Sequence, residues 1–213
     1  SADAKRAQAH AAGATVLEIR GSFDDALRLC RELGELEGYV LVNSLNPDRI
    51  EGQKSVVSEL VEQLGEVPQV IALPYGGGGN TSAVAAACAE AGIAPAIVSG
   101  EAAERPTTFA SAIRIGEPAH LENVHRLEAD GAVTVVSLEE DELRAAWQRL
   151  AREEGVFCEP ASAAGVAALV KLGITGKSAV AIVTGHGLKD TGAVDASSAR
   201  VVDATLDAVL EAL

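Results

Sequence analysis

Two hydrophobic periods alternate along this chain. Short runs of apolar and β-branched residues, typical of buried strands, fall at residues 15–19, 39–42, 70–73, 94–98, 132–136 and 179–183. Apolar residues recur at helical spacing in residues 2–12, 23–33, 51–64, 82–91, 107–114, 119–129, 139–154, 161–172 and 203–213. This alternation predicts an α/β fold with a doubly wound, mainly parallel sheet and right-handed crossovers.

A glycine loop follows the strand expected at residues 70–73. Four consecutive glycines end in Asn80, and a helix begins behind them. Glycines let backbone N–H groups approach a ligand closely, and a helix N-terminus adds partial positive charge. A P-loop would need Lys and Ser or Thr at Asn80 and Thr81, and a dinucleotide fingerprint would need Gly at Thr81. The loop therefore suits a single phosphate group, with a ligand-free strand-to-helix turn as the alternative.

Three polar loops follow expected strands, at residues 43–49, 76–80 and 184–190. Ligands of open parallel sheets bind outside the carboxyl ends of the strands, so these loops are the candidate site. The first loop has a second interpretation. Asn46 and Pro47 are also ordinary turn residues at the entry to a helix.

Composition and charge restrict the class of protein. The 213 residues are 48% hydrophobic and 3% aromatic, which allows one large domain or two small ones. The net charge of −14 makes nucleic acids and anionic membranes poor partners. No apolar run approaches the roughly 20 residues of a membrane span. The three cysteines are scattered without metal-ligand spacing, so we expect no disulfide framework, no metal site and a reducing, cytoplasmic location.

Five sequence blocks in order give the chain a specific resemblance. They read NSLNPDRIEGQK at residues 43–54, GGGGN at 76–80, AIRIG at 112–116, EEGVFCEPASAA at 153–164 and VTGHGLKD at 183–190. Together they resemble threonine synthase, a fold-type II pyridoxal-phosphate enzyme. The resemblance implies a tryptophan synthase β-like sheet, truncated at the N-terminus, with residues 1–42 left from the smaller domain and 43–213 forming the larger, cofactor-binding domain. It also suggests a homodimer.

The resemblance implies roles for the matched positions. Thr184 would hydrogen-bond the pyridine nitrogen of pyridoxal 5′-phosphate. The substrate would be a phosphorylated amino acid, O-phospho-L-homoserine, converted with water to L-threonine and phosphate in threonine biosynthesis. The cofactor phosphate would be held by Gly76, Gly77, Gly78, Gly79 and Asn80, and the substrate phosphate by Asn43, Ser44 and Arg49.

Two departures from the family pattern qualify this picture. The family's Schiff-base lysine belongs to a Ser-Phe-Lys-Asp type motif upstream of the matched blocks, and this chain has no such motif. Lys189 precedes an Asp but belongs to the Thr184 block, so we assign no catalytic residue and expect this chain alone to be inactive. Gly77 stands where the family carries an Asn, which leaves substrate identity less defined than cofactor type.

Two other functions stay open on the sequence. The all-glycine loop also suits a threonine or serine ammonia-lyase of the same fold. The lacking lysine also suits a non-catalytic remnant that binds a phosphate ligand or a partner. The histidines His10, His120 and His125 are expected on solvated helix faces.

Overall fold

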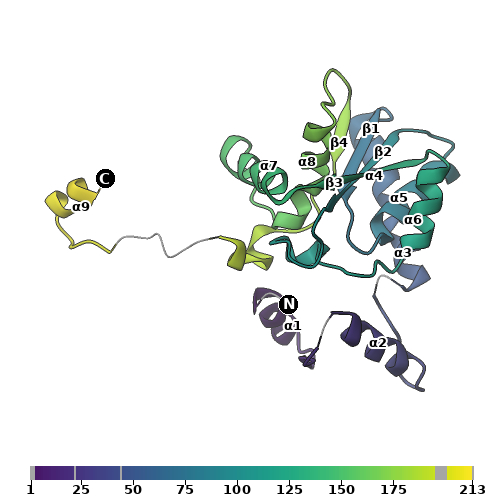
Figure 1. Cartoon of the computed structure of the whole chain (residues 1–213), viewed down its shortest axis with the longest axis horizontal. Helices are drawn as coiled ribbons and strands as arrows, with labels where there is room; N and C mark the ends of the chain where they lie inside the picture. Colours follow the sequence, from purple (N-terminus) through teal and green to yellow (C-terminus); the bar gives the residue numbers. More distant parts are fainter. Residues whose placement is uncertain (1–2, 22, 44, 195–200, 213) are drawn as a thin grey trace.

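The computed structural model describes residues 3–21, 23–43, 45–194 and 201–212 (Figure 1). Its strands are β1 (Val70–Pro74), β2 (Ala96–Ala102), β3 (Val133–Leu138) and β4 (Ala179–Ala181). Its α-helices are α1 (Asp3–Ala11), α2 (Phe23–Gly34), α3 (Pro47–Gln53), α4 (Ser55–Leu64), α5 (Gly79–Glu90), α6 (Leu121–Ala129), α7 (Glu140–Glu153), α8 (Ala164–Lys171) and α9 (Leu206–Ala212).

The strands form one parallel sheet in the order β3-β2-β1-β4. β1 is central: Val70 lies opposite Ala96 of β2 on one side and Ala179 of β4 on the other. The prediction of an α/β fold with a parallel sheet is confirmed.

Helices cover both faces of the sheet. Figure 1 shows α7 and α8 on one side of the strands and α4, α5 and α6 on the other. Residues 70–73 are at most 1% exposed, because β1 is buried on both faces. Val70 and Ala72 pack in the core on the α8 side, whereas Ile71 and Leu73 pack with Val84 of α5. The alternation of side chains along a strand thus feeds two separate cores.

Helix α8 lies against the sheet with no room for a side chain between them. A Cβ on Gly165 would be 2.8 Å from the backbone nitrogen of Leu73, and one on Gly100 would meet the Ala164 carbonyl oxygen. Glycine at these two positions therefore sets the distance between α8 and strands β1 and β2.

Three of the predicted elements are wrong. Residues 15–19 and 39–42 are not strands, and their apolar side chains lie largely in solvent, with Leu17 and Val40 each 79% exposed. A β-rich pattern forms a strand only where a partner supplies hydrogen bonds, and the described residues offer none there. Residues 107–114 contain only the 3₁₀ turn Ser111–Ile113.

Side-chain bonds explain why residues 107–114 do not form a helix. The Glu140 carboxylate accepts hydrogen bonds from the Thr108 hydroxyl at 2.9 Å and the Phe109 amide at 2.8 Å. The Arg114 guanidinium donates to the Thr108 carbonyl at 2.9 Å. These bonds satisfy the backbone outside a helix, so the segment is pinned to α7 instead.

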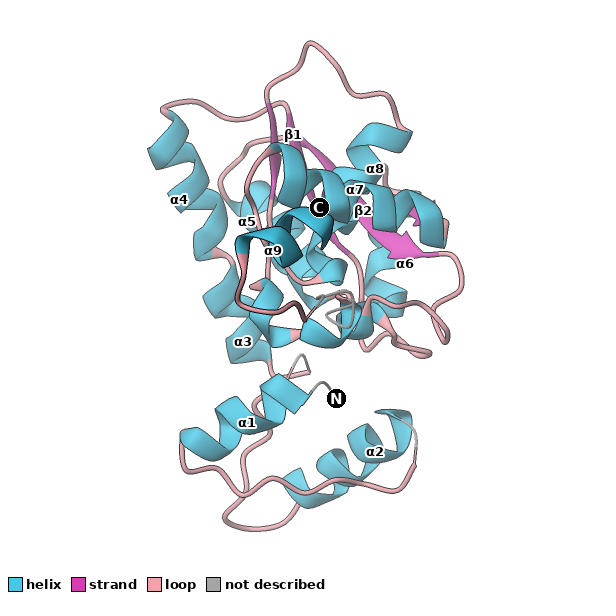
Figure 2. Ribbon diagram, turned by 90° about the vertical axis from the view of Figure 1, so that its left-hand side faces the viewer, coloured by secondary structure: helices cyan, strands magenta, loops and turns pink. Residues whose placement is uncertain are grey.

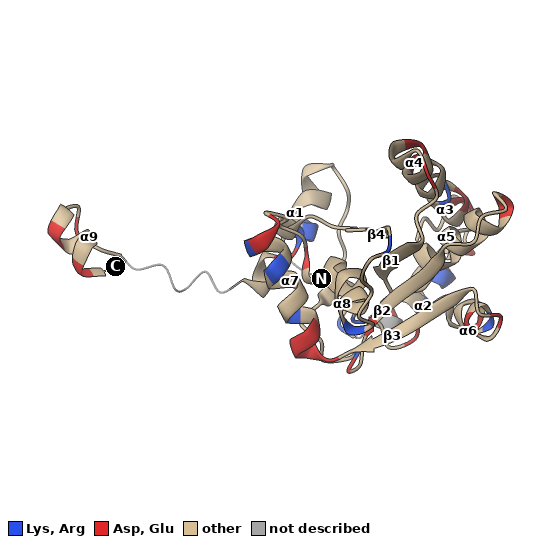
Figure 3. Ribbon diagram, turned by 90° about the horizontal axis from the view of Figure 1, so that it is seen from above, with Lys and Arg blue, Asp and Glu red and all other residues tan. Residues whose placement is uncertain are grey.

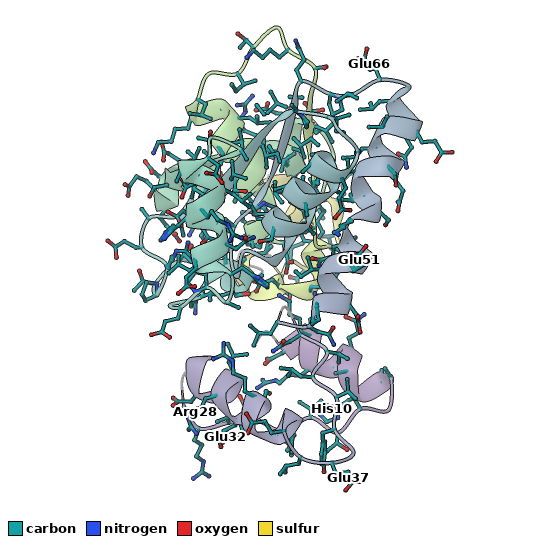
Figure 4. The ribbon with its side chains drawn as sticks, turned by 90° about the vertical axis from the view of Figure 1, so that its right-hand side faces the viewer. His10, Arg28, Glu32, Glu37, Glu51 and Glu66 are labelled. Atoms are coloured by element: carbon teal, nitrogen blue, oxygen red, sulfur yellow. The ribbon has the colours of Figure 1, made fainter. Side chains whose placement is uncertain are left out.

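Helices α1 and α2 lie beneath the remainder of the chain (Figure 2). Lys5 of α1 reaches the main body, where its Nζ lies 2.9 Å from Oε2 of the buried Glu159. His10 is exposed on α1, near the labelled Arg28 and Glu32 of α2 (Figure 4). The strands are almost free of charged residues, which gather on the outer helices (Figure 3).

The described residues contain no helix long and apolar enough to cross a membrane. They also hold no group of three or more His, Cys, Asp or Glu side chains placed to bind a metal ion.

The three thiols should react at very different rates. Cys30 is exposed, whereas Cys88 and Cys158 are buried, and burial raises the pKa of both buried thiols. Because the thiolate is the reactive form, we expect iodoacetamide to label Cys30 in the folded chain and the other two only after unfolding. Mass spectrometry of alkylated peptides measures this. Labelling of Cys88 as fast as Cys30 would contradict the packing of α5 against the sheet.

Candidate functional site

The chain order of the strands creates a crevice at one end of the sheet. From β1 the chain moves outward to β2 and β3, and then returns to place β4 on the opposite side of β1. The loops after β1 and β4 therefore diverge where the connections change direction. Such a switch point is the usual ligand site of an open parallel sheet.

The glycine loop, Gly76–Asn80, connects β1 to α5 at this point. Gly78 is the N-cap of α5 with φ of 84°, a left-handed conformation that favours glycine. A Cβ on Gly78 would lie 3.0 Å from Cβ of His120, and one on Gly76 would lie 3.2 Å from the Ala112 carbonyl oxygen. The first N–H groups of α5, beginning with Gly79 and Asn80, have no partner within the helix. The loop can thus present several donors to one anion.

A cavity of about 450 Å³ opens in front of this loop. It is lined by Arg49 and Gln53 of α3, Pro74, the glycine loop, Ala112, Ile113 and Ile115 after β2, Ala161, and Thr184 after β4. Three segments that are far apart in the sequence therefore meet at the cavity, as the positions of the loops predicted.

Helix α3 supplies two of the polar groups. Its N-cap is Asn46, whose side chain accepts a hydrogen bond from the Asp48 amide at 2.8 Å. Arg49 and Gln53 are four residues apart on this helix, so they share one face. Oε1 of Gln53 is buried and has no hydrogen-bond partner among the described residues. A buried amide oxygen without a partner costs about 1–3 kcal/mol, which a ligand at the cavity would recover.

Thr184 lies opposite α3, immediately after the strand of β4. Its Oγ1 is 3.0 Å from Oγ of the buried Ser162, and that oxygen accepts a hydrogen bond from the Gly185 amide at 2.7 Å. The Thr184 side chain itself is exposed to the cavity. Ser162 therefore orients Thr184 while leaving its hydroxyl available.

Two predicted substrate-binding residues lie differently. Asn43 is half-buried and is not among the cavity-lining residues; its Oδ1 accepts a hydrogen bond from the Leu45 amide at 2.9 Å. That is the geometry of an Asx turn. Ser44 lies outside the described residues. Arg49 alone of the predicted substrate trio is placed at the cavity.

All five lysines lie within the described residues, and none lines the cavity. Nζ of Lys54 is 2.6 Å from both Glu51 and Glu90, and the hydrogen bonds to Glu51 and then Glu90 raise its pKa. Lys189 is exposed. Both lysines that the sequence brought into question are therefore turned to other surroundings.

Three residues at the site were not singled out by sequence reasoning. Gln53 could have been found from its spacing to Arg49, because residues four apart share a helix face. His120 was expected on a solvated helix face, but it is half-buried and its backbone N–H donates to the Gly77 carbonyl at 3.0 Å. Ser162 carried no signal for its bond to Thr184 beyond its place in the EPAS motif.

Comparison with known proteins identifies the family. A family model described as "Pyridoxal-phosphate dependent enzyme" matches residues 1–185. The chain belongs to this family. Pyridoxal 5′-phosphate is thus the cofactor of its family, as the resemblance implied.

Curated relatives narrow the similarity within the pyridoxal-phosphate enzymes. The chain is 41% identical over 207 residues to the threonine synthase of Halalkalibacterium halodurans, covering 87% of this chain and 58% of the relative. It is 39% identical to that of Mycobacterium leprae, covering 98% of this chain and 65% of the relative. The chain thus spans about three fifths of the length of the threonine synthases it matches.

Solved structures show the same fold at lower identity. A threonine deaminase from the bacterium abbreviated T.th. superposes with a TM-score of 0.67 at 23% identity, covering 86% of this chain and 66% of that one. Maize serine racemase gives 0.69 at 22% identity, covering 89% and 64%. The predicted fold-type II architecture is confirmed.

The residues at the cavity fit this cofactor. The glycine loop leaves no space for a Cβ at Gly76 or Gly78, so only backbone faces the ligand there. Thr184 offers a neutral hydroxyl across the cavity, and the buried Gln53 oxygen lacks a partner among the described residues. Donors for a phosphate at one wall and a hydroxyl at another match a phosphorylated pyridine.

Proposed function

We propose that this chain is the cofactor-binding part of a threonine synthase, which converts O-phospho-L-homoserine and water to L-threonine and phosphate. The observation that carries the proposal is the meeting of Arg49, the glycine loop and Thr184 at one cavity. Threonine synthases at 38–41% identity support this choice among the family's reactions. The pyridine ring of the cofactor, when bound, supplies an electron sink for the substrate's α-carbon.

The residues of the chain would bind and orient the reactants. The amides of the glycine loop and the N-terminus of α5 would hold the cofactor phosphate. The Thr184 hydroxyl would hydrogen-bond the pyridine nitrogen, with Ser162 fixing its direction. Being neutral, it leaves the ring a weaker electron sink than a carboxylate partner would. Arg49 would grip the substrate phosphate with its planar guanidinium, and Gln53 would contribute an amide beside it.

No lysine of this chain lies at the cavity, so we propose that activity requires a lysine from outside the described cavity walls. Residues 43–213 would form the larger domain and residues 1–42 part of the smaller one. A cytoplasmic homodimer fits the three free cysteines and the family resemblance.

A second candidate is a threonine or serine ammonia-lyase. The superposition on threonine deaminase and serine racemase favours it, although at 22–23% identity the likeness is one of fold. Such an enzyme would bind serine or threonine, which carry no phosphate, and would have no use for Arg49 at the cavity.

Substrate binding distinguishes the two candidates. With pyridoxal phosphate present, O-phospho-L-homoserine should bind more tightly than L-homoserine, and Arg49→Ala should weaken only the phosphorylated ligand, by about 10- to 30-fold. Gln53→Leu should have a smaller effect in the same direction. Calorimetry measures all three proteins.

Arg149→Ala is the matched control. Arg149 is also exposed on a helix and pairs with Glu153 four residues away, 3.1 Å distant, but lies on α7 away from the cavity. The ammonia-lyase candidate would be favoured if L-serine and L-threonine bound while O-phospho-L-homoserine did not.

A further inference from the structure

A second group of side chains lies behind the glycine loop. Pro74 and Gly76 line the cavity described above, but Tyr75 between them lines a separate cavity of about 370 Å³. This alternation is that of an extended chain. Tyr75 is only 2% exposed, and its backbone N–H donates to the Gly100 carbonyl at 2.7 Å. The residue before the loop is thus fixed between β1 and β2.

Arg105 connects Tyr75 to the loop itself. Its guanidinium carbon lies 4.6 Å from the centre of the Tyr75 ring, and its Nη1 donates to the Gly76 carbonyl at 3.3 Å. Its Nη2 pairs with the Glu101 carboxylate. The Arg105 side chain is 16% exposed, so these contacts are partly shielded from water. One side chain therefore joins the end of β2, the ring of Tyr75 and the first peptide of the glycine loop.

The ring of Tyr75 is held by its face more than by its hydroxyl. The hydroxyl oxygen is buried without a hydrogen-bond partner among the described residues. Burial raises the pKa of this phenol, and Arg105 acts in the opposite direction. A partly desolvated guanidinium over an aromatic face is attractive by itself. The ring edge in turn lies 3.2 Å from where a Cβ on Gly78 would be, so its position bears on the loop.

A bond to the Gly76 carbonyl also orients an amide. The Gly76 carbonyl and the Gly77 N–H belong to one planar trans peptide and point in opposite directions. Arg105 takes the carbonyl on its own side, which turns the Gly77 N–H away from it. The next peptide is held in the same way, because the His120 N–H donates to the Gly77 carbonyl at 3.0 Å. Two successive amides of the loop are thus directed by donors bound to their carbonyls.

We propose that Arg105 is a positioning residue of the phosphate site, which fixes the Gly77 amide toward the ligand through the Gly76 carbonyl and the Tyr75 ring. The inference rests on the proposed role of the glycine loop as a phosphate cradle. Glu101 keeps the guanidinium in place by pairing with it. The positive charge also polarises the shared peptide, which makes the Gly77 N–H a stronger donor.

The test compares a ligand with and without its phosphate. Pyridoxine 5′-phosphate and pyridoxine carry no aldehyde, so neither reacts with lysines, and fluorescence titration gives both affinities for the full chain. Arg105→Ala should weaken pyridoxine 5′-phosphate about 10-fold and leave pyridoxine unchanged, because only the phosphate meets the loop. Glu101→Gln should act in the same direction with a smaller loss.

Arg144→Ala provides the matched control. Arg144 also stacks on an aromatic ring, 4.0 Å from the centre of Phe109, and pairs with Glu140 at 3.7 Å, but it lies on α7. It should change neither affinity. If Arg105→Ala fails to fold, Arg105→Lys keeps a charge beside Glu101 without the planar group and should lose phosphate affinity partially.

Each outcome separates the inference from the function beneath it. Wild-type affinity for pyridoxine 5′-phosphate in Arg105→Ala, or an equal loss for both ligands, would overturn the positioning role while leaving the cradle in place. A wild-type chain that binds both ligands equally would overturn the cradle and the positioning role together.

Discussion

Replacing Gly78 by valine should abolish the preference of the chain for phosphorylated ligands. Gly78 has φ of 84°, where an L side chain costs about 1–2 kcal/mol. A Cβ there would lie 3.0 Å from Cβ of His120 and 3.1 Å from Cγ2 of Val124. The loop would have to move away from α6. Losing two amide bonds to a phosphate, at about 1.5–3 kcal/mol each, corresponds to at least a 100-fold loss of affinity.

Titration with pyridoxine 5′-phosphate measures this loss. Gly92→Val is the control, because Gly92 has φ of 66°, lies just after α5 and has no atom within 4 Å of a Cβ position. It bears the same backbone strain without crowding the cavity and should keep wild-type affinity. Gly78→Ala is the milder variant if the valine variant unfolds. Retention of phosphate affinity by both Gly78 variants would show that the loop does not hold the phosphate.

Gly165→Ala should produce the largest loss of stability. A Cβ at this position would lie 2.8 Å from the Leu73 nitrogen and 3.0 Å from the Ala72 carbonyl carbon, which are backbone atoms of the central strand. They cannot rotate aside, so α8 must separate from β1. Overpacking of this kind costs about 3 kcal/mol. In a chain of this length that lowers the melting temperature by about 10 °C.

Gly52→Ala is the opposing control for thermal unfolding. Gly52 lies within α3 and has no atom within 4 Å of a Cβ position. Alanine is the better helix former by about 1 kcal/mol, so this variant should be unchanged or slightly more stable. A Gly165→Ala protein as stable as Gly52→Ala would mean that α8 is not in close contact with β1.

The periodicity of the sequence was sufficient for the central fold. Continuous apolar runs predicted β1, β2, β3 and β4 because strands buried on both faces carry no alternation that could mislead. The loops after β1 and β4 could be expected to share a site, since parallel strands end at the same edge. Residues 15–19 have the composition of a strand, but composition says nothing about a partner for its hydrogen bonds.

The remaining features of the site depend on tertiary contacts. The Asn43 side chain bonds within its own turn, and this local competition is invisible in a motif that also suits phosphate binding. The contact of Arg105 with Gly76 joins residues 29 apart in the sequence. Neither residue type nor spacing announces it. Sequence reasoning thus located the glycine loop, but the groups that orient it became visible only in three dimensions.

The position of β4 beside β1 also determines when the ligand site can form during synthesis. Gln69, which precedes β1, and Ser178, which precedes β4, are joined by hydrogen bonds across 109 residues. At about 5–20 residues per second, a ribosome needs roughly 5–20 s to make the intervening chain. Until then one edge of β1 has no native partner and can pair with a strand of another nascent chain. Thr184 follows β4 directly, so the wall that it forms is added last.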